Sequence, residues 1–127
     1  MTKNILGIAS VLALITIILG AFGAHALKDK LDPESMQSFE TGVRYMMYHV
    51  LALLFINSSS LLSDKSKKLI SYIFFAGILL FSGSIFVISL DIIPAKNIWF
   101  LTPLGGLILI FAWLISALGF FKSTEKH

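Results

Sequence analysis

The chain has 127 residues, a formal net charge of +3 and a mean hydropathy of +0.89, and 57% of its residues are hydrophobic. Soluble domains are usually about 45–50% apolar, so the composition argues against a soluble fold, and the length allows one domain. Without cysteine, disulfides and thiolate chemistry are excluded, and the ten basic residues are too scattered for a nucleic-acid surface.

Four long apolar runs stand out, at about 5–26, 43–62, 69–90 and 98–121. Each is long enough, at 1.5 Å per residue, to cross a hydrocarbon layer of about 30 Å. Three carry no charge, and the second carries only Arg44. Backbone in lipid must satisfy its own hydrogen bonds, so such runs are helices. The sequence predicts an all-α fold, a single integral membrane domain over residues 1–127 built as an up-down bundle of four transmembrane helices.

The first run, predicted as a helix over 5–26, shares features with a signal peptide. Lys3 precedes it, and Ala24-His25-Ala26 matches a cleavage site. The apolar stretch is longer than the roughly 7–15 residues of a typical signal core, so we expect it to be retained, with cleavage as the alternative. Gly20 and Ala24 lie one turn apart, a spacing that suits close helix packing.

The second helix is predicted to begin outside the membrane. Asp32-Pro33-Glu34 has the pattern of a helix start: an N-cap aspartate, then proline in the first turn, then an acid. We therefore expect a helix over 33–62 that extends beyond the bilayer. Glu40 and Arg44 form an i, i+4 pair near the point of entry.

The third and fourth helices are predicted over 69–90 and 98–121, with polar turns before each. Ser82-Gly83-Ser84 indicates a surface for close packing, or else a polar lining for a pathway. Thr102-Pro103-Leu104-Gly105-Gly106 interrupts the fourth apolar run. This interruption predicts a kink tolerated by neighbouring helices, with a cavity lined by exposed carbonyls as the alternative.

Orientation follows from the excess of basic residues on one side of the membrane. The amino terminus, the turn at 63–68 and the tail hold Lys3, Lys65, Lys67, Lys68, Lys122 and Lys126, and the opposite side holds Lys28, Lys30, Arg44 and Lys96. The positive-inside rule then predicts that both termini are cytoplasmic, in the plasma (inner) membrane if the source is bacterial.

A cluster of polar residues on or near the second helix is the candidate binding site. It comprises His25, Glu40, Arg44, Tyr45, Tyr48 and His49. Polar groups within membrane helices usually face other helices, water or a ligand. One hypothesis is a pocket for an anion or a lipid headgroup, and the other is an interhelical hydrogen-bond cluster that fixes packing.

Other chemistry is weakly indicated. Three histidines, one of them the terminal His127, without thiols give no metal site, no cofactor motif is present, and no nucleophile elbow points to a hydrolase. The acids lie in predicted loops or at helix ends, which disfavours a proton-coupled antiporter.

Several segments resemble the family of small four-helix membrane proteins known as domain of unknown function 423, with relatives of transmembrane protein 256. They are Gly20-Ala21-Phe22-Gly23-Ala24-His25-Ala26-Leu27, Thr41-Gly42-Val43-Arg44-Tyr45 with Tyr48-His49 and Leu51-Ala52-Leu53-Leu54, Ser82-Gly83-Ser84, and Thr102-Pro103-Leu104-Gly105-Gly106 with Trp113. The resemblance implies an integral membrane protein and supplies no activity.

We therefore predict a structural or accessory membrane protein that binds lipid or a partner at the polar cluster. The alternative is a small-solute or ion carrier that acts as an oligomer, since four helices enclose little space. A third hypothesis, an intramembrane enzyme using His25 or His49, requires both imidazoles and Arg44 to converge on one cavity. The expected partners are the lipid bilayer and a second copy of the chain.

Overall fold

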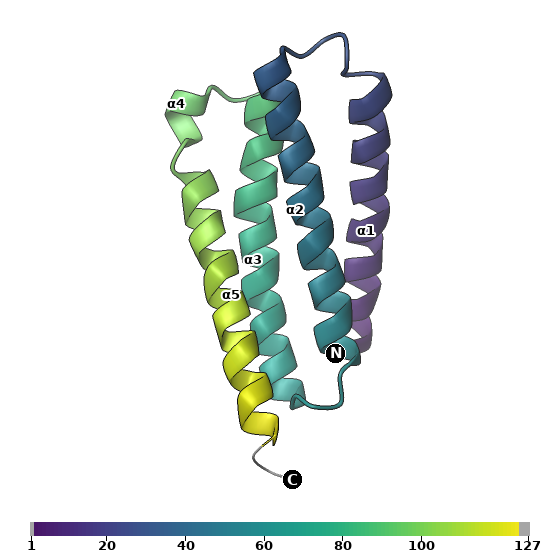
Figure 1. Cartoon of the computed structure of the whole chain (residues 1–127), viewed down its shortest axis with the longest axis vertical. Helices are drawn as coiled ribbons and strands as arrows, with labels where there is room; N and C mark the ends of the chain where they lie inside the picture. The colour runs from purple at the N-terminus through teal and green to yellow at the C-terminus, as the bar shows by residue number, and fades with distance from the viewer. Residues whose placement is uncertain (1, 125–127) are drawn as a thin grey trace.

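The computed structural model describes residues 2–124 and forms an elongated bundle of antiparallel helices (Figure 1). Four are long: α1 (Thr2–His25), α2 (Pro33–Ser58), α3 (Asp64–Ser89) and α5 (Leu101–Thr124). The fifth, α4 (Ala95–Ile98), is a single turn. No strand occurs in the described part of the chain, so the all-α prediction is confirmed.

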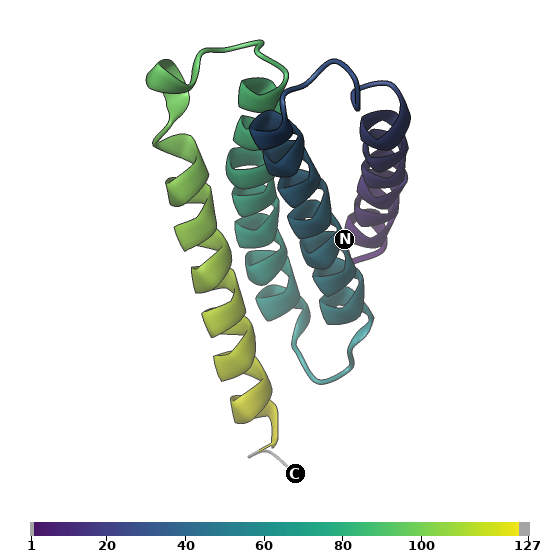
Figure 2. The same ribbon diagram turned by 45° about the horizontal axis from the view of Figure 1, so that its top comes forward.

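The long helices lie in chain order across the bundle. α1 packs mainly on α2, α2 on α3, and α3 on α5. Figures 1 and 2 show α2 between α1 and α3, with α1 and α3 running in the same direction. Both described ends of the chain therefore lie at the end that carries the α2–α3 loop. Lys126, counted on the predicted cytoplasmic side, and the terminal His127 lie outside the described residues.

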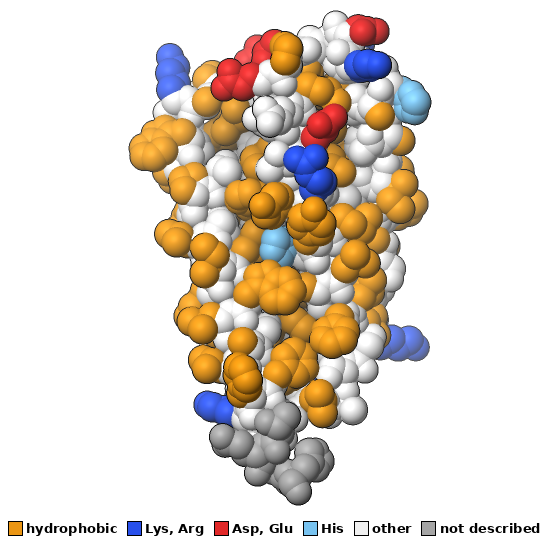
Figure 3. Space-filling view, in the orientation of Figure 1, with side chains coloured by type: hydrophobic (Ala, Val, Ile, Leu, Met, Phe, Trp, Pro, Cys, Tyr) orange, Lys and Arg blue, Asp and Glu red, His pale blue; other side chains and the backbone are white. Residues whose placement is uncertain are grey.

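Three of these helices, α1, α3 and α5, are long and apolar enough to cross a membrane. α2 is equally long but not apolar enough to count among them by composition, because its sequence includes Arg44, His49 and Asn57. Large hydrophobic side chains cover most of the face seen in Figure 3, and charged groups gather toward its two ends. This distribution is the one expected where the surrounding solvent is hydrocarbon.

Capping residues set the helix limits more sharply than the apolar runs do. At the start of α2, the Asp32 side chain accepts a hydrogen bond from Ser35 N at 2.9 Å, which confirms the predicted N-cap. α2 ends at Ser58 rather than at 62. α3 begins at Asp64, five residues before the apolar run, because Ser63 caps it by accepting a hydrogen bond from Ser66 N.

The fourth apolar run is divided rather than continuous. The turn α4 precedes it, and α5 starts at Leu101 instead of 98. Pro103 thus lies in the first turn of α5, where backbone amides have no partner within the helix, so its missing N–H breaks no helical hydrogen bond. The residues that interrupt the fourth apolar run, 102–106, therefore lie at the start of α5.

The closest helix contacts are made by glycines on α3 and α5. A Cβ added to Gly105 would lie 2.4 Å from the Phe81 backbone nitrogen, and one added to Gly77 would lie 2.5 Å from Leu109 Cδ2. The α1–α2 seam is looser at Gly20, where an added Cβ would lie 3.4 Å from Val43. The other small residues proposed from sequence, Ala24, Gly83 and Gly106, make no such close approach or are exposed.

Side-chain hydrogen bonds join neighbouring helices inside the bundle. Ser82 Oγ on α3 donates to the Gly42 carbonyl on α2 at 2.9 Å. Asn57 Nδ2 on α2 donates to Ser71 Oγ on α3 at 2.8 Å. The Ser84 hydroxyl on α3 contacts the Thr102 hydroxyl on α5. Such polar contacts commonly fix the packing of membrane helices.

Candidate functional site

The six residues of the predicted polar cluster differ in exposure. Five are exposed, namely His25, Glu40, Arg44, Tyr45 and Tyr48. The sixth, His49, is buried with 6% of its surface exposed. His49 is therefore the member of the cluster that lies between helices.

Arg44 lies on the exposed surface of α2 and makes one weak side-chain contact. Its Nη2 lies 3.4 Å from Thr41 Oγ1. Within residues 2–124 no ion pair joins Arg44 to Glu40, although the two are one turn apart. The guanidinium is thus left to interact with what surrounds the protein. A long basic side chain near the end of a span usually extends toward the headgroups.

His49 is held by a hydrogen bond to its own helix. Its Nδ1 contacts the carbonyl oxygen of Tyr45, one turn earlier. A carbonyl oxygen only accepts, so Nδ1 carries the proton and Nε2 presents a lone pair. No described residue donates to Nε2. The imidazole is therefore a fixed hydrogen-bond acceptor with its free nitrogen turned away from α2.

Aromatic rings from three helices surround this imidazole. The His49 ring centroid lies 5.8 Å from that of Phe74 on α3, 6.1 Å from that of Trp113 on α5, and 6.3 Å from that of Tyr45. Phe74 and Trp113 meet edge to face at 5.4 Å. These distances are those of favourable aromatic pairs.

The aromatic surface continues along α2 and α3 beyond the imidazole. Tyr45 packs on Phe81 at 5.3 Å and edge to face on Tyr48 at 5.5 Å. We call the whole group the His49 aromatic cluster; its members are Tyr45, Tyr48, His49, Phe74, Phe81 and Trp113. Tyr48 and Trp113 are about half exposed, at 54% and 48%, so the cluster reaches the lipid-facing surface.

The two described histidines do not converge. His25 is at the end of α1, whereas His49 lies about 24 Å along the axis of α2 from Pro33. The His49 ring contacts α3 and α5, on the side of α2 away from α1. Arg44 is exposed and contacts neither ring. The hypothesis of an enzyme using both imidazoles and Arg44 in one cavity is therefore wrong.

A metal centre has no support in the described part of the chain. Among residues 2–124 no group of three His, Cys, Asp or Glu side chains is close enough to hold an ion. The geometry around His49 offers one hydrogen-bond acceptor and several aromatic faces. Sequence reasoning found His49, Tyr45 and Tyr48 but missed the rings on α3 and α5, since no spacing rule relates residues on different helices.

Comparison with known proteins places the chain among membrane proteins. A family model described as "Protein of unknown function (DUF423)" matches residues 19–106. The UPF0382 membrane protein YwdK of Bacillus subtilis (strain 168) is 40% identical over 108 residues, which cover 81% of this chain and 84% of that protein. A UPF0382 membrane protein of Haemophilus influenzae is 34% identical over 125 residues, covering 98% and 99%. No solved structure matches the chain.

Proposed function

The chain belongs to the DUF423 family of membrane proteins, and we propose that it crosses the bilayer four times and binds a lipid-soluble ligand that carries a hydroxyl group. The ligand's hydroxyl donates to His49 Nε2, and its apolar body packs on the His49 aromatic cluster. This proposal makes the protein an accessory of the membrane rather than an enzyme. No bond in the ligand is formed or broken.

The directions of the helices support four crossings. α1 and α3 are both apolar enough to span, and they run in the same direction (Figure 1). A chain in which both cross has to return across the membrane between them, which supports α2 as a further span. Its 26 residues give a length of about 39 Å, enough to cross with its first turns outside the hydrocarbon.

The orientation is proposed from lysine placement. Lys3, the lysines of the first turn of α3, and Lys122 all lie at the end that carries both described chain ends. By the positive-inside rule this end is cytoplasmic, and the α1–α2 loop faces outward. For a bacterial chain the membrane is the plasma membrane.

The single observation that carries the binding proposal is the unpaired Nε2 of His49. With the first turns of α2 outside the hydrocarbon, residues 41–58 span it and His49 lies near its middle. Water is scarce at that depth, so an acceptor that no protein group pairs stays without a hydrogen bond until a ligand supplies the donor. A ligand hydroxyl restores that hydrogen bond, and the ligand must itself be soluble in the bilayer core. A hydroquinone, with an aromatic ring and two hydroxyl groups, has both properties.

No specific observation favours the alternative of a solute or ion carrier. A route within one copy would need a polar path between helices. The α3–α5 seam is closed by backbone contact at Gly105 and by Leu109 against Gly77. Three of the buried hydroxyls on α3, those of Ser71, Ser82 and Ser84, are bonded to neighbouring helices.

The test uses tryptophan fluorescence of the protein in nanodiscs. Trp113 belongs to the cluster, and replacing Trp99 by phenylalanine removes the other tryptophan. We expect a decyl-substituted hydroquinone to quench Trp113 and to bind about two- to tenfold more tightly than its dimethyl ether, which cannot donate. His49→Phe should abolish this preference, whereas His25→Phe should leave it unchanged. Equal affinities of the two compounds for the parent protein would overturn the proposal, and this comparison does not depend on any histidine variant folding.

A further inference from the structure

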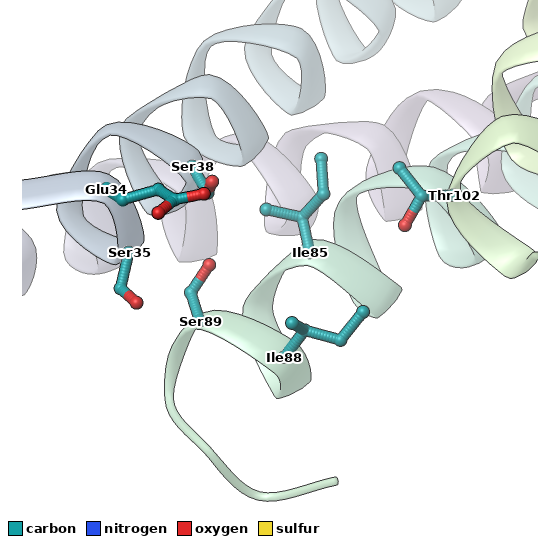
Figure 4. Close-up of a pocket in the computed structure, with 7 residues that line it drawn as sticks. All are labelled: Glu34, Ser35, Ser38, Ile85, Ile88, Ser89 and Thr102. Atoms are coloured by element: carbon teal, nitrogen blue, oxygen red, sulfur yellow. The ribbon is translucent and has the colours of Figure 1, made fainter. Parts of the chain in front are cut away.

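A second polar site lies at the opposite end of the bundle from the described chain ends. A pocket of about 280 Å³ opens between the start of α2, the end of α3 and the start of α5 (Figure 4). It is lined by Glu34, Ser35, Ser38, Ile85, Ile88, Ser89 and Thr102. None of these residues belongs to the polar cluster predicted from the sequence.

Ser89 is the residue that distinguishes this pocket from an ordinary surface hollow. Only 4% of Ser89 is exposed, and its hydroxyl has no hydrogen-bond partner within the protein. Figure 4 shows the Ser89 oxygen directed toward the start of α2, where Glu34, Ser35 and Ser38 form the facing wall. A buried hydroxyl without a partner is destabilising, so this group is positioned for a partner from outside the chain.

The directions of the existing hydrogen bonds determine what the pocket can accept. Ser84 donates its single proton to the Phe81 carbonyl, so in the contact between Ser84 and Thr102 the donor is Thr102. Thr102 therefore offers only lone pairs to a ligand. Ser35 donates to Asp32 Oδ2 at 2.9 Å and is likewise left as an acceptor. Two of the four lining hydroxyls thus have no proton to give.

The carboxylates at the mouth of the pocket also favour a ligand that donates hydrogen bonds and carries positive charge. Glu34 lines the pocket, and no ion pair to it occurs within residues 2–124. At the start of α2 the Ser35 backbone N–H donates to the Asp32 carboxylate, so this donor is not available to an anion. Hydrogen bonds from the Ser35 backbone and side chain lower the pKa of Asp32, which keeps a second carboxylate ionised beside the pocket. The site therefore attracts cations and repels phosphate.

We propose that this pocket binds a primary ammonium group. Such a group carries three N–H donors and one positive charge, which match the Glu34 carboxylate and the acceptor oxygens of Ser35, Thr102 and Ser89. The pocket lies where spanning helices end, at the depth of lipid headgroups. The ammonium is supplied by the ethanolamine headgroup of a phospholipid or by a soluble primary amine. A trimethylated ammonium, as in choline, has no N–H and is discriminated against.

Native mass spectrometry of the protein released from nanodiscs of mixed lipids separates the two sources. With equal amounts of phosphatidylethanolamine and phosphatidylcholine, we expect the ethanolamine lipid to be retained about tenfold in excess. Glu34→Gln should abolish this excess and Ser89→Ala should reduce it severalfold. The matched control is Glu40→Gln, an exposed carboxylate on the same helix outside the pocket, which should behave as the parent protein.

A second measurement uses free ethanolamine in nanodiscs made of phosphatidylcholine alone. Thermal stabilisation by ethanolamine in the parent and Glu40→Gln proteins, lost in Glu34→Gln, would support the site with a soluble amine as its ligand, even without a lipid preference. Equal retention of the two lipids together with no stabilisation by ethanolamine would overturn the proposal. Neither measurement involves His49, so its outcome is independent of hydroquinone binding.

Discussion

Replacing Gly105 by alanine is the sharpest test of the α3–α5 contact. The new Cβ would lie 2.4 Å from the Phe81 nitrogen and 2.8 Å from both Phe81 Cα and the Leu80 carbonyl carbon. These are backbone atoms, so no change of rotamer relieves the overlap. The two helices must separate by about 1 Å to restore ordinary contact distances, and overpacking of this kind lowers the free energy of unfolding by about 1–3 kcal/mol.

The neighbouring glycine provides a matched control. An alanine Cβ at Gly106 would lie 3.7 Å from Phe81 Cδ2, an ordinary contact with a side chain. Both substitutions gain the same helix propensity, about 0.5–1 kcal/mol. The difference between the two alanine variants therefore isolates the overlap. Gly77→Ala should fall between them, because the atom it meets first is the end of the Leu109 side chain.

The measurement is unfolding in dodecyl maltoside by added SDS, followed by far-UV circular dichroism. We expect Gly105→Ala to unfold at a lower SDS fraction than Gly106→Ala, by an amount that corresponds to about 1–3 kcal/mol. Gly106→Ala should equal or exceed the parent protein in stability. If the two alanine variants unfold together, α3 and α5 do not approach backbone to backbone at this position, and the register of the bundle described above is wrong.

Three further predictions concern the polar groups and the topology. Ser71→Ala removes the partner that accepts a hydrogen bond from buried Asn57 and should lower the free energy of unfolding by about 0.5–1.5 kcal/mol in the same SDS titration. The pKa of Asp32 is lowered in the fold, so its capping contribution to stability is complete above the ordinary value of 3.8 and is lost as pH falls through the lowered value. The stability difference between the parent protein and Asp32→Asn should therefore shrink over that pH range. A difference that stays constant would contradict the cap. Because the chain has no cysteine, an impermeant maleimide on intact cells should label Asp29→Cys in the α1–α2 loop but not Ser60→Cys in the α2–α3 loop, whereas labelling of both from one side would mean that α2 does not cross.

Local signals in the sequence predicted the helix class and the start of α2 correctly. Asp32, Pro33 and Glu34 act through contacts with their own helix, so their spacing alone determines the cap. The ends of the apolar runs were less informative. α3 begins within a lysine-rich stretch, because Ser63 can cap a helix there, and of its three lysines Lys65 and Lys68 are exposed whereas Lys67 is buried.

The candidate site was predicted only in part, because spacing relates residues on one helix and says nothing of its neighbours. Tyr45 and His49 are one turn apart, yet Tyr45 is 42% exposed and His49 only 6%. The difference arises from where Phe74 and Trp113 approach α2. The aromatic partners of His49 and the pocket lined by Glu34 and Ser89 both depend on contacts between helices. The chain has no local sequence signature for such contacts.

Small polar side chains join helices inside this bundle, within a core that is otherwise apolar, and α3 shows the pattern clearly. Its outer face carries large apolar side chains such as Leu79, whereas the buried residues include Ser71, Ser82 and Ser89, which share one face at spacings near whole helical turns. Ser71 is bonded to Asn57 and Ser82 to the Gly42 carbonyl. Hydroxyls on this face therefore serve to join α3 to α2 wherever α2 is within reach. Ser89 lies on the same face and faces the start of α2, but it has no bond to that helix. Its unpaired state is what turns the end of the seam from a packing contact into a binding site.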